Sequence, residues 1–128
     1  MARKKILLID DERDLCLVMK LNLERTGRYA VETACSGPEG LEKARGTAFD
    51  LVITDFHMPE MDGGAVLHAL KAMRPRAPVV LCSVYHDDAT RITETLQQEA
   101  DGLIGKPIDQ VQLQRTVQDA LAKAADGG

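Results

Sequence analysis

Short apolar runs alternate with longer amphipathic stretches along the chain. The runs are rich in β-branched and aliphatic residues, and several are continuously apolar, as expected for strands covered on both faces. The stretches between them carry apolar residues at helical spacing. This alternation predicts five strands and five helices in an α/β fold with a parallel sheet. The expected strands are residues 5–9, 29–33, 51–54, 78–82 and 102–104.

Capping signals and apolar stripes indicate where three of the helices lie. Ser36, followed three residues later by Glu39, has the spacing of a capping box, and that helix should end near Gly46. A helix from about residue 87 has a thin apolar stripe, so we expect marginal packing and an easily shifted position. The last helix should begin near Asp109 and pack through Leu113, Val117, Ala120, Leu121 and Ala124.

Composition narrows the class of protein. The chain has 128 residues, 45% of them apolar and 28% charged, and a net charge of −4, which is typical of one soluble domain. The acidic balance argues against direct nucleic-acid binding, and 3% aromatic residues provide few rings for stacking bases. No apolar run is long enough for a membrane span and no signal-peptide pattern is present, so we expect a cytoplasmic protein. Cys16, Cys35 and Cys82 have neither disulfide-framework nor zinc-site spacing and are interpreted as buried thiols.

Polar residues with related chemistry follow four of the expected strands. Asp10 and Asp11 follow the first strand, Asp55 the third, Ser83 the fourth and Lys106 the fifth. Ligands of open parallel sheets bind at the carboxyl ends of the strands, so these side chains should converge. Each residue alone has an ordinary interpretation as a cap, turn residue or solvated cation, but their joint occurrence favours a site.

Three converging carboxylates repel one another, so they would need a cation or would stay partly protonated. Mg²⁺ suits such a cluster because it binds through one or two carboxylates and shares its shell with water and phosphate oxygens. A carboxylate at this position can act as a nucleophile toward phosphorus, and Asp55, followed by a loop with proline and glycine, is the best candidate. Lys106 would contact phosphoryl oxygens and Ser83 would donate a hydroxyl.

The motifs together resemble one family over nearly the whole chain. They are Ile6-Leu7-Leu8-Ile9-Asp10-Asp11-Glu12, Asp50 to Pro59, Met61-Asp62-Gly63, Val79 to Ser83 and Gly105-Lys106-Pro107. This set resembles the receiver domain of two-component response regulators, a phosphoprotein module of phosphorelay signal transduction. The resemblance implies a flavodoxin-like (βα)5 fold with strand order 2-1-3-4-5, for which a chemotaxis receiver is a standard example.

The resemblance also implies a role for each site residue. Asp55 would be the phospho-acceptor. Mg²⁺ would be held by Asp10, Asp11, Asp55 and the backbone carbonyl of His57. Ser83 would be the switch hydroxyl, Lys106 would contact the phosphoryl group, and the bond before Pro107 would be cis.

The chain departs from the family pattern at the switch. Leu103 stands where many receivers have Tyr or Phe, so we expect coupling through Ser83 and displacement of the fourth helix instead. Val84, where receivers mostly have Ala or Gly, would narrow access to the phosphoryl group. His57 and Tyr85 occupy positions that tune how long the phosphate lasts, and we expect their bulk to obstruct water and lengthen that lifetime.

The resemblance implies a sensor histidine kinase or histidine phosphotransfer protein as partner. Leu15, Cys16, Met19 and Leu23 share one side of the first helix, whereas Leu17 and Leu21 should be exposed on the opposite side. Isolated exposed leucines are common, but receivers dock on their kinase largely through this helix, so both residues are candidates for the docking face. A downstream protein or appended output domain would bind the face made by the fourth helix, fifth strand and fifth helix, and a homodimer would be possible.

Two other functions stay open. A pseudo-receiver would keep the fold as an interaction module without phosphorylation. An aspartyl-phosphate hydrolase is disfavoured. The haloacid-dehalogenase pattern has a second Asp two residues after the nucleophile, and His57 occupies that position here. The receiver should occupy residues 1–124, with 122–128 a frayed helix end and 125–128 a tail or linker start. We therefore expect either a stand-alone regulator without an output domain or the amino-terminal piece of a longer one.

Overall fold

Five parallel strands form a single sheet in the computed structural model, which describes residues 3–73, 76–84 and 99–127. The strand order is β2-β1-β3-β4-β5, which confirms the expected doubly wound fold. The strands are β1 (Lys4–Ile9), β2 (Tyr29–Ala34), β3 (Leu51–Asp55), β4 (Val79–Val84) and β5 (Gly102–Lys106). The described helices are α1 (Arg13–Glu24), α2 (Gly37–Gly46), α3 (Gly63–Lys71) and α5 (Gln110–Gly127). The expected fourth helix lies outside the described residues.

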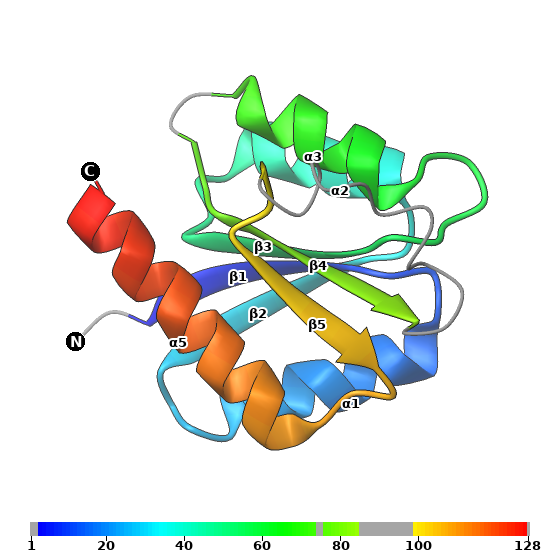
Figure 1. Ribbon diagram of the computed structural model, residues 1–128. Coiled ribbons are helices and arrows are strands. Elements are labelled where there is room, and N and C mark those ends of the chain that lie inside the picture. Colours follow the sequence, from blue (N-terminus) through cyan, green and yellow to red (C-terminus); the bar gives the residue numbers. More distant parts are fainter. Residues whose placement is uncertain (1–2, 74–75, 85–98, 128) are drawn as a thin grey trace.

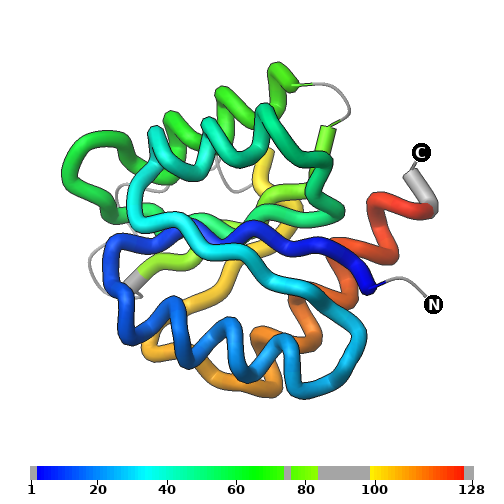
Figure 2. The backbone as a smooth tube through the Cα atoms, turned by 180° about the vertical axis from the view of Figure 1, so that it is seen from behind, coloured from blue at the N-terminus to red at the C-terminus, as the bar shows by residue number. Residues whose placement is uncertain are grey.

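Helices cover both faces of the sheet, as the continuously apolar strands predict. Helices α1 and α5 lie on one face and α2 and α3 on the other (Figure 1), and the view from behind shows the same layers (Figure 2). Side chains alternate along each strand, so Ile6 and Leu8 of β1 pack in the α1 and α5 core, whereas Leu7 and Ile9 pack in the α2 and α3 core.

The helix ends agree with the capping signals. The Ser36 hydroxyl accepts a hydrogen bond from the backbone N–H of Glu39 at 3.2 Å. The Glu39 carboxylate accepts one from Cys35 at 3.1 Å, one residue before the position that a capping box uses. The Asp109 carboxylate caps the start of α5 by accepting from the backbone N–H of Val111 at 2.8 Å.

Burial corrects two details of the sequence interpretation. Cys16 and Cys82 are buried, but Cys35 is only half-buried because it lies in the turn after β2. Ala124 is exposed although it falls on the apolar stripe, because the end of α5 runs past the sheet (Figure 1). Helix α5 itself extends to Gly127, within the stretch expected to be a frayed helix end or the start of a linker.

The exposed side of α1 and the apolar character of the helices complete the description of the fold. Leu17 and Leu21 are 55% and 58% exposed, which confirms the predicted polar-side position of both residues on α1. None of the helices in the described ranges is long and apolar enough to cross a bilayer.

Candidate functional site

The candidate residues lie at the carboxyl edge of the sheet, where the order of the strands brings them together. Asp10 directly follows β1, while Asp55 and Lys106 are the last residues of β3 and β5. The register pairs Ile9 with Thr54, so Asp10 and Asp55 emerge side by side from the centre of the sheet. Both carboxylates are consequently buried, with Asp55 5% exposed.

Lys106 connects the carboxylates. Its ammonium Nζ lies 3.0 Å from Asp55 Oδ1 and 3.2 Å from Asp10 Oδ2. Glu12 Oε1 is 4.0 Å from the same Nζ. The other oxygen of Asp10 accepts a hydrogen bond from the backbone N–H of Glu12 at 2.9 Å, which fixes the orientation of that carboxylate.

Burial dominates the electrostatics of this cluster. Burial, followed by repulsion from Asp10, raises the pKa of Asp55 from 3.8 to about 6, although Lys106 lowers it. Burial also raises the pKa of Asp10, against the lowering effects of the Glu12 N–H and Lys106. For Lys106, burial lowers the pKa, but attraction to Asp55 and Asp10 outweighs burial and raises it above 10.5. Lys106 therefore stays charged at neutral pH and only partly compensates its two partners.

The carboxylates fit a hard divalent cation. Asp10, Asp11 and Asp55 each offer an oxygen, and the three oxygens lie within 4.8 Å of one another. Asp11 is exposed while the other two are buried, so the cluster opens toward solvent on one side. Oxygen donors with a partly open shell suit Mg²⁺, and the raised pKa of Asp55 shows that its charge lacks full compensation from the protein alone.

Two further predicted site residues of the described part of the chain, Ser83 and His57, lie on β4 and just after β3. Ser83 is half-buried on β4 and pairs in register with Gly105, next to Lys106. Within the described part of the chain, it makes no hydrogen bond to the three aspartates or Lys106. His57 follows β3, and its ring packs edge-on against Phe56, with the ring centroids 5.4 Å apart.

The predicted switch residues are only partly described. Leu103 is 39% exposed on β5, and the peptide bond between Lys106 and Pro107 is cis. Val84 belongs to β4, but its side chain lies outside the described residues, as does all of Tyr85.

Two residues of the site had no assigned role in the sequence. Glu12 contacts Lys106, and its only sequence signal is its position directly after the Asp10-Asp11 pair. Gly63 begins α3 against the end of β3, and its N–H donates to the carbonyl of Phe56 at 2.8 Å. A Cβ on Gly63 would lie 2.7 Å from Phe56 Cα and 2.8 Å from the Asp55 carbonyl oxygen. Only glycine therefore allows this close return of the chain behind Asp55.

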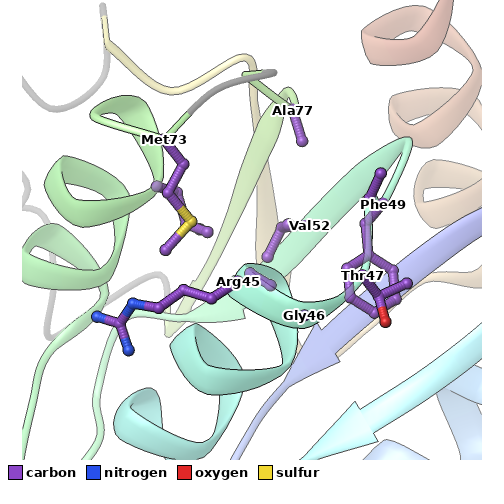
Figure 3. Close-up of a pocket in the computed structure, with 10 residues that line it drawn as sticks. Arg45, Gly46, Thr47, Phe49, Val52, Met73 and Ala77 are labelled. Carbon is purple, nitrogen blue, oxygen red and sulfur yellow. The ribbon is translucent and has the colours of Figure 1, made fainter.

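A separate cavity of about 340 Å³ lies at the opposite edge of the sheet (Figure 3). It is formed by the end of α2, the segment leading into β3 and the end of α3, including Arg45, Phe49, Val52 and Met73. No aspartate or glutamate lines it. The three aspartates of the cluster thus lie away from this cavity.

This chain is similar to known proteins in both sequence and fold. The response regulator receiver domain model matches residues 6–118. The transcriptional regulatory protein ZraR of Escherichia coli K12 is 39% identical over 117 residues, which cover 91% of this chain and 26% of that protein. The chain thus spans about a quarter of the length of this curated relative.

Solved structures of receiver domains have a similar fold. A CheY-like response regulator receiver domain protein from Methanospirillum hungatei superposes with a TM-score of 0.89 at 28% identity, covering 99% of this chain and 100% of that chain. A response regulator receiver domain protein from Clostridium thermocellum has a TM-score of 0.84 at 30% identity, with 95% and 97% of the chains covered. With the family model matched over most of its length, this chain belongs to the response regulator receiver domain family.

Proposed function

We propose that this receiver accepts a phosphoryl group on Asp55 from a histidine kinase or histidine phosphotransfer protein, and signals by a change of conformation. The observation that carries the proposal is the contact of Lys106 with Asp55 at 3.0 Å inside a cluster of three carboxylates. This arrangement supplies a nucleophile and a fixed cation at one solvent-facing edge. Receivers are signalling modules, and here the chain's own residues would promote phosphorylation and dephosphorylation without turnover of a separate substrate.

The residues would divide the work as follows. An Asp55 carboxylate oxygen attacks phosphorus, the phosphorus–nitrogen bond of the donor histidine breaks, and the imidazole nitrogen keeps the electron pair. Lys106 moves its hydrogen bond from Asp55 to a phosphoryl oxygen, so that its charge faces the transferred group. Ser83, whose strand β4 pairs with β5, would donate its hydroxyl to another phosphoryl oxygen.

Asp10, Asp11 and Asp55, with the backbone carbonyl of His57, would hold Mg²⁺. When bound, Mg²⁺ supplies positive charge that draws the phosphoryl oxygens to the carboxylates. Because the Glu12 N–H and Lys106 already fix the orientation of Asp10, this carboxylate needs little rearrangement to act as a ligand.

Intact mass after incubation with acetyl phosphate tests this function. We expect one phosphate adduct on the wild-type protein in Mg²⁺, and none in EDTA or in Asp55→Asn. Asp50→Asn is the matched control, because Asp50 precedes the same strand at its other end and accepts the backbone N–H of Lys5 at 2.7 Å. An adduct that survives Asp55→Asn would refute the proposal. Absence of any adduct would favour the pseudo-receiver.

The exposed side of α1 supports a docking role toward the kinase. Leu17 and Leu21 lie four residues apart on the surface of a helix that begins beside the aspartate cluster. We expect Leu17→Glu with Leu21→Glu to slow phosphotransfer from the kinase and to leave acetyl phosphate labelling unchanged. Ala48→Glu with Ala72→Glu adds the same charge at exposed positions outside α1 and should slow neither reaction. Equal loss of both reactions in the leucine variant would reject docking.

The output would be read on the surface near β5 and α5. Leu103 is exposed on β5, three residues before Lys106, so a shift of Lys106 toward a phosphoryl group acts on the same short strand. A downstream protein, an appended output domain or a second receiver would bind this surface. The fourth helix, which we expect to move with it, lies outside the described residues.

A further inference from the structure

Three arginines line a groove between α1 and α5, the two helices on the sheet face opposite to α2 and α3. Both views of the backbone show these two helices side by side (Figures 1 and 2). The groove has a volume of about 630 Å³, and Arg25, Arg28 and Arg115 line it together with several carboxamide side chains. No aspartate or glutamate lines it, although the chain as a whole carries a net charge of −4. The groove is therefore a local concentration of positive charge on an acidic protein.

Carboxylates of the described residues do not pair with these arginines. None of the three forms an ion pair within the described ranges of the chain. Glu24, the acidic residue adjacent to Arg25, is turned toward the sheet, where its carboxylate accepts the backbone N–H of Val31 at 3.1 Å. The positive charge of the groove is thus available to an external anion.

Exposed apolar side chains gather on the two helices that form the groove. The large hydrophobic residues exposed in the described part of the chain are Leu17, Val18, Leu21, Leu103 and Val111. All except Leu103 belong to α1 or to the first turns of α5. Val111 is 68% exposed and lines the groove itself. Such clustering is typical of a protein interaction surface.

Gln114 adds a third kind of recognition. Its Nε2 donates a hydrogen bond to the backbone carbonyl of Asn22 at 3.0 Å, which connects the two helices and orients the amide. Its Oε1 is buried and accepts no hydrogen bond within the described residues. A buried acceptor without a donor is unfavourable, so we expect the Gln114 side chain to shift and expose Oε1 when an occupant brings an N–H group to it.

We propose that this groove binds an acidic segment of a partner protein. Carboxylates of the segment pair with Arg25, Arg28 and Arg115, a backbone N–H donates to Gln114 Oε1, and apolar side chains pack on Val111. A polypeptide combines these three chemistries, whereas inorganic phosphate offers no apolar surface. Helix α1 has 12 residues and spans ~18 Å, so Arg25 lies at the end remote from Asp10. The groove therefore provides contact beyond the phosphoryl site and goes beyond the function proposed above.

The test uses a fluorescein-labelled peptide, Glu-Glu-Leu-Glu-Glu-Leu-Glu-Glu, and measures its affinity by fluorescence anisotropy. We expect the triple variant Arg25→Gln, Arg28→Gln, Arg115→Gln to weaken binding at least ~10-fold, since three charge pairs are lost. The control triple variant Arg3→Gln, Arg45→Gln, Arg76→Gln removes the same charge at exposed positions elsewhere and should change the affinity less than ~2-fold. Equal weakening in both variants would overturn the proposal, because attraction would then depend on net charge alone.

Two further comparisons separate the apolar and polar contributions. A peptide with serine in place of both leucines, and the variant Gln114→Leu, should each bind ~3-fold or more weakly. Tighter binding of a ten-nucleotide oligothymidylate than of the peptide would overturn the proposal in favour of nucleic acid. A wild-type dimer that the arginine triple variant abolishes would overturn it in favour of a second copy. Far-ultraviolet circular dichroism and the urea unfolding midpoint report folding of every variant, so this test stays independent of phosphorylation at Asp55.

Discussion

Replacing Asp55 with asparagine should stabilise the metal-free protein at neutral pH. Asp55 is 5% exposed, and its pKa of about 6 lies above the usual 3.8 mainly because burial penalises the charged form. At ~1.4 kcal/mol per pKa unit, this difference makes the ionised carboxylate ~3 kcal/mol less favourable in the folded than in the unfolded protein. Asparagine has nearly the same shape and no charge, so it should recover part of that energy.

The raised pKa of Asp55 determines whether the free energy of unfolding rises or falls with pH. Between pH 3.8 and about 6 the folded protein holds a proton on Asp55 that the unfolded chain has already lost. The free energy of unfolding should therefore fall as pH rises through this window and level off above it. Burial raises the pKa of Asp10 in the same direction, so Asp55→Asn should flatten the slope without removing it.

Urea unfolding in EDTA at pH 4.5 and 7.5 measures both effects. We expect Asp55→Asn to raise the free energy of unfolding by up to ~3 kcal/mol at pH 7.5 and by much less at pH 4.5. Asp11→Asn is the matched control, because Asp11 belongs to the same cluster but is exposed, and its gain should be smaller. If Asp55→Asn is less stable than the wild-type protein at pH 7.5, the ion pair with Lys106 outweighs burial and the reasoning fails.

Three shorter predictions concern the same edge of the sheet. Gly63→Ala should lower the melting temperature, because its Cβ would lie 2.7 Å from a backbone carbon, whereas Gly46→Ala, with nothing within 4 Å, should be neutral or stabilising by up to ~1 kcal/mol. Lys106→Met should slow acetyl phosphate labelling by ~100-fold, and an unchanged rate would contradict its proposed role. His57→Ala with Tyr85→Ala should shorten the phosphorylated lifetime, and slower phosphate loss in that double variant than in wild type would refute the expected obstruction of water.

The fold was predictable because the apolar pattern has few solutions. Continuously apolar strands separated by amphipathic stretches require a parallel sheet covered on both sides, and the carboxyl edge of that sheet gathers Asp10, Asp55 and Lys106. The apolar pattern does not predict how far a helix extends beyond the sheet on which it packs. Ala124 keeps the helical spacing of a core residue, yet it is exposed because α5 outruns the sheet.

The contacts within the site were less predictable than its position. Residue types predict a cluster of carboxylates with one lysine, but the division of Lys106 between Asp55 and Asp10 depends on strand register and rotamers. Similarly, the contact of Glu12 with Lys106 depends on how the chain turns after β1. The arginine groove joins residues about 90 positions apart, such as Asn22 and Gln114, and no local pattern connects them.

The charge of the resting site links its stability to the proposed function. Asp10, Asp11, Asp55 and Glu12 bring four negative charges and Lys106 one positive charge, which leaves a net charge of −3 at one edge of the sheet. A divalent cation offsets most of that charge, so the burial that disfavours ionised Asp55 becomes a source of affinity for Mg²⁺. Asp55→Asn removes one ligand and one charge together, and its stability advantage in EDTA should therefore shrink as Mg²⁺ is added. The carboxylate that destabilises the resting fold is then the one that the metal and the phosphoryl donor need ionised.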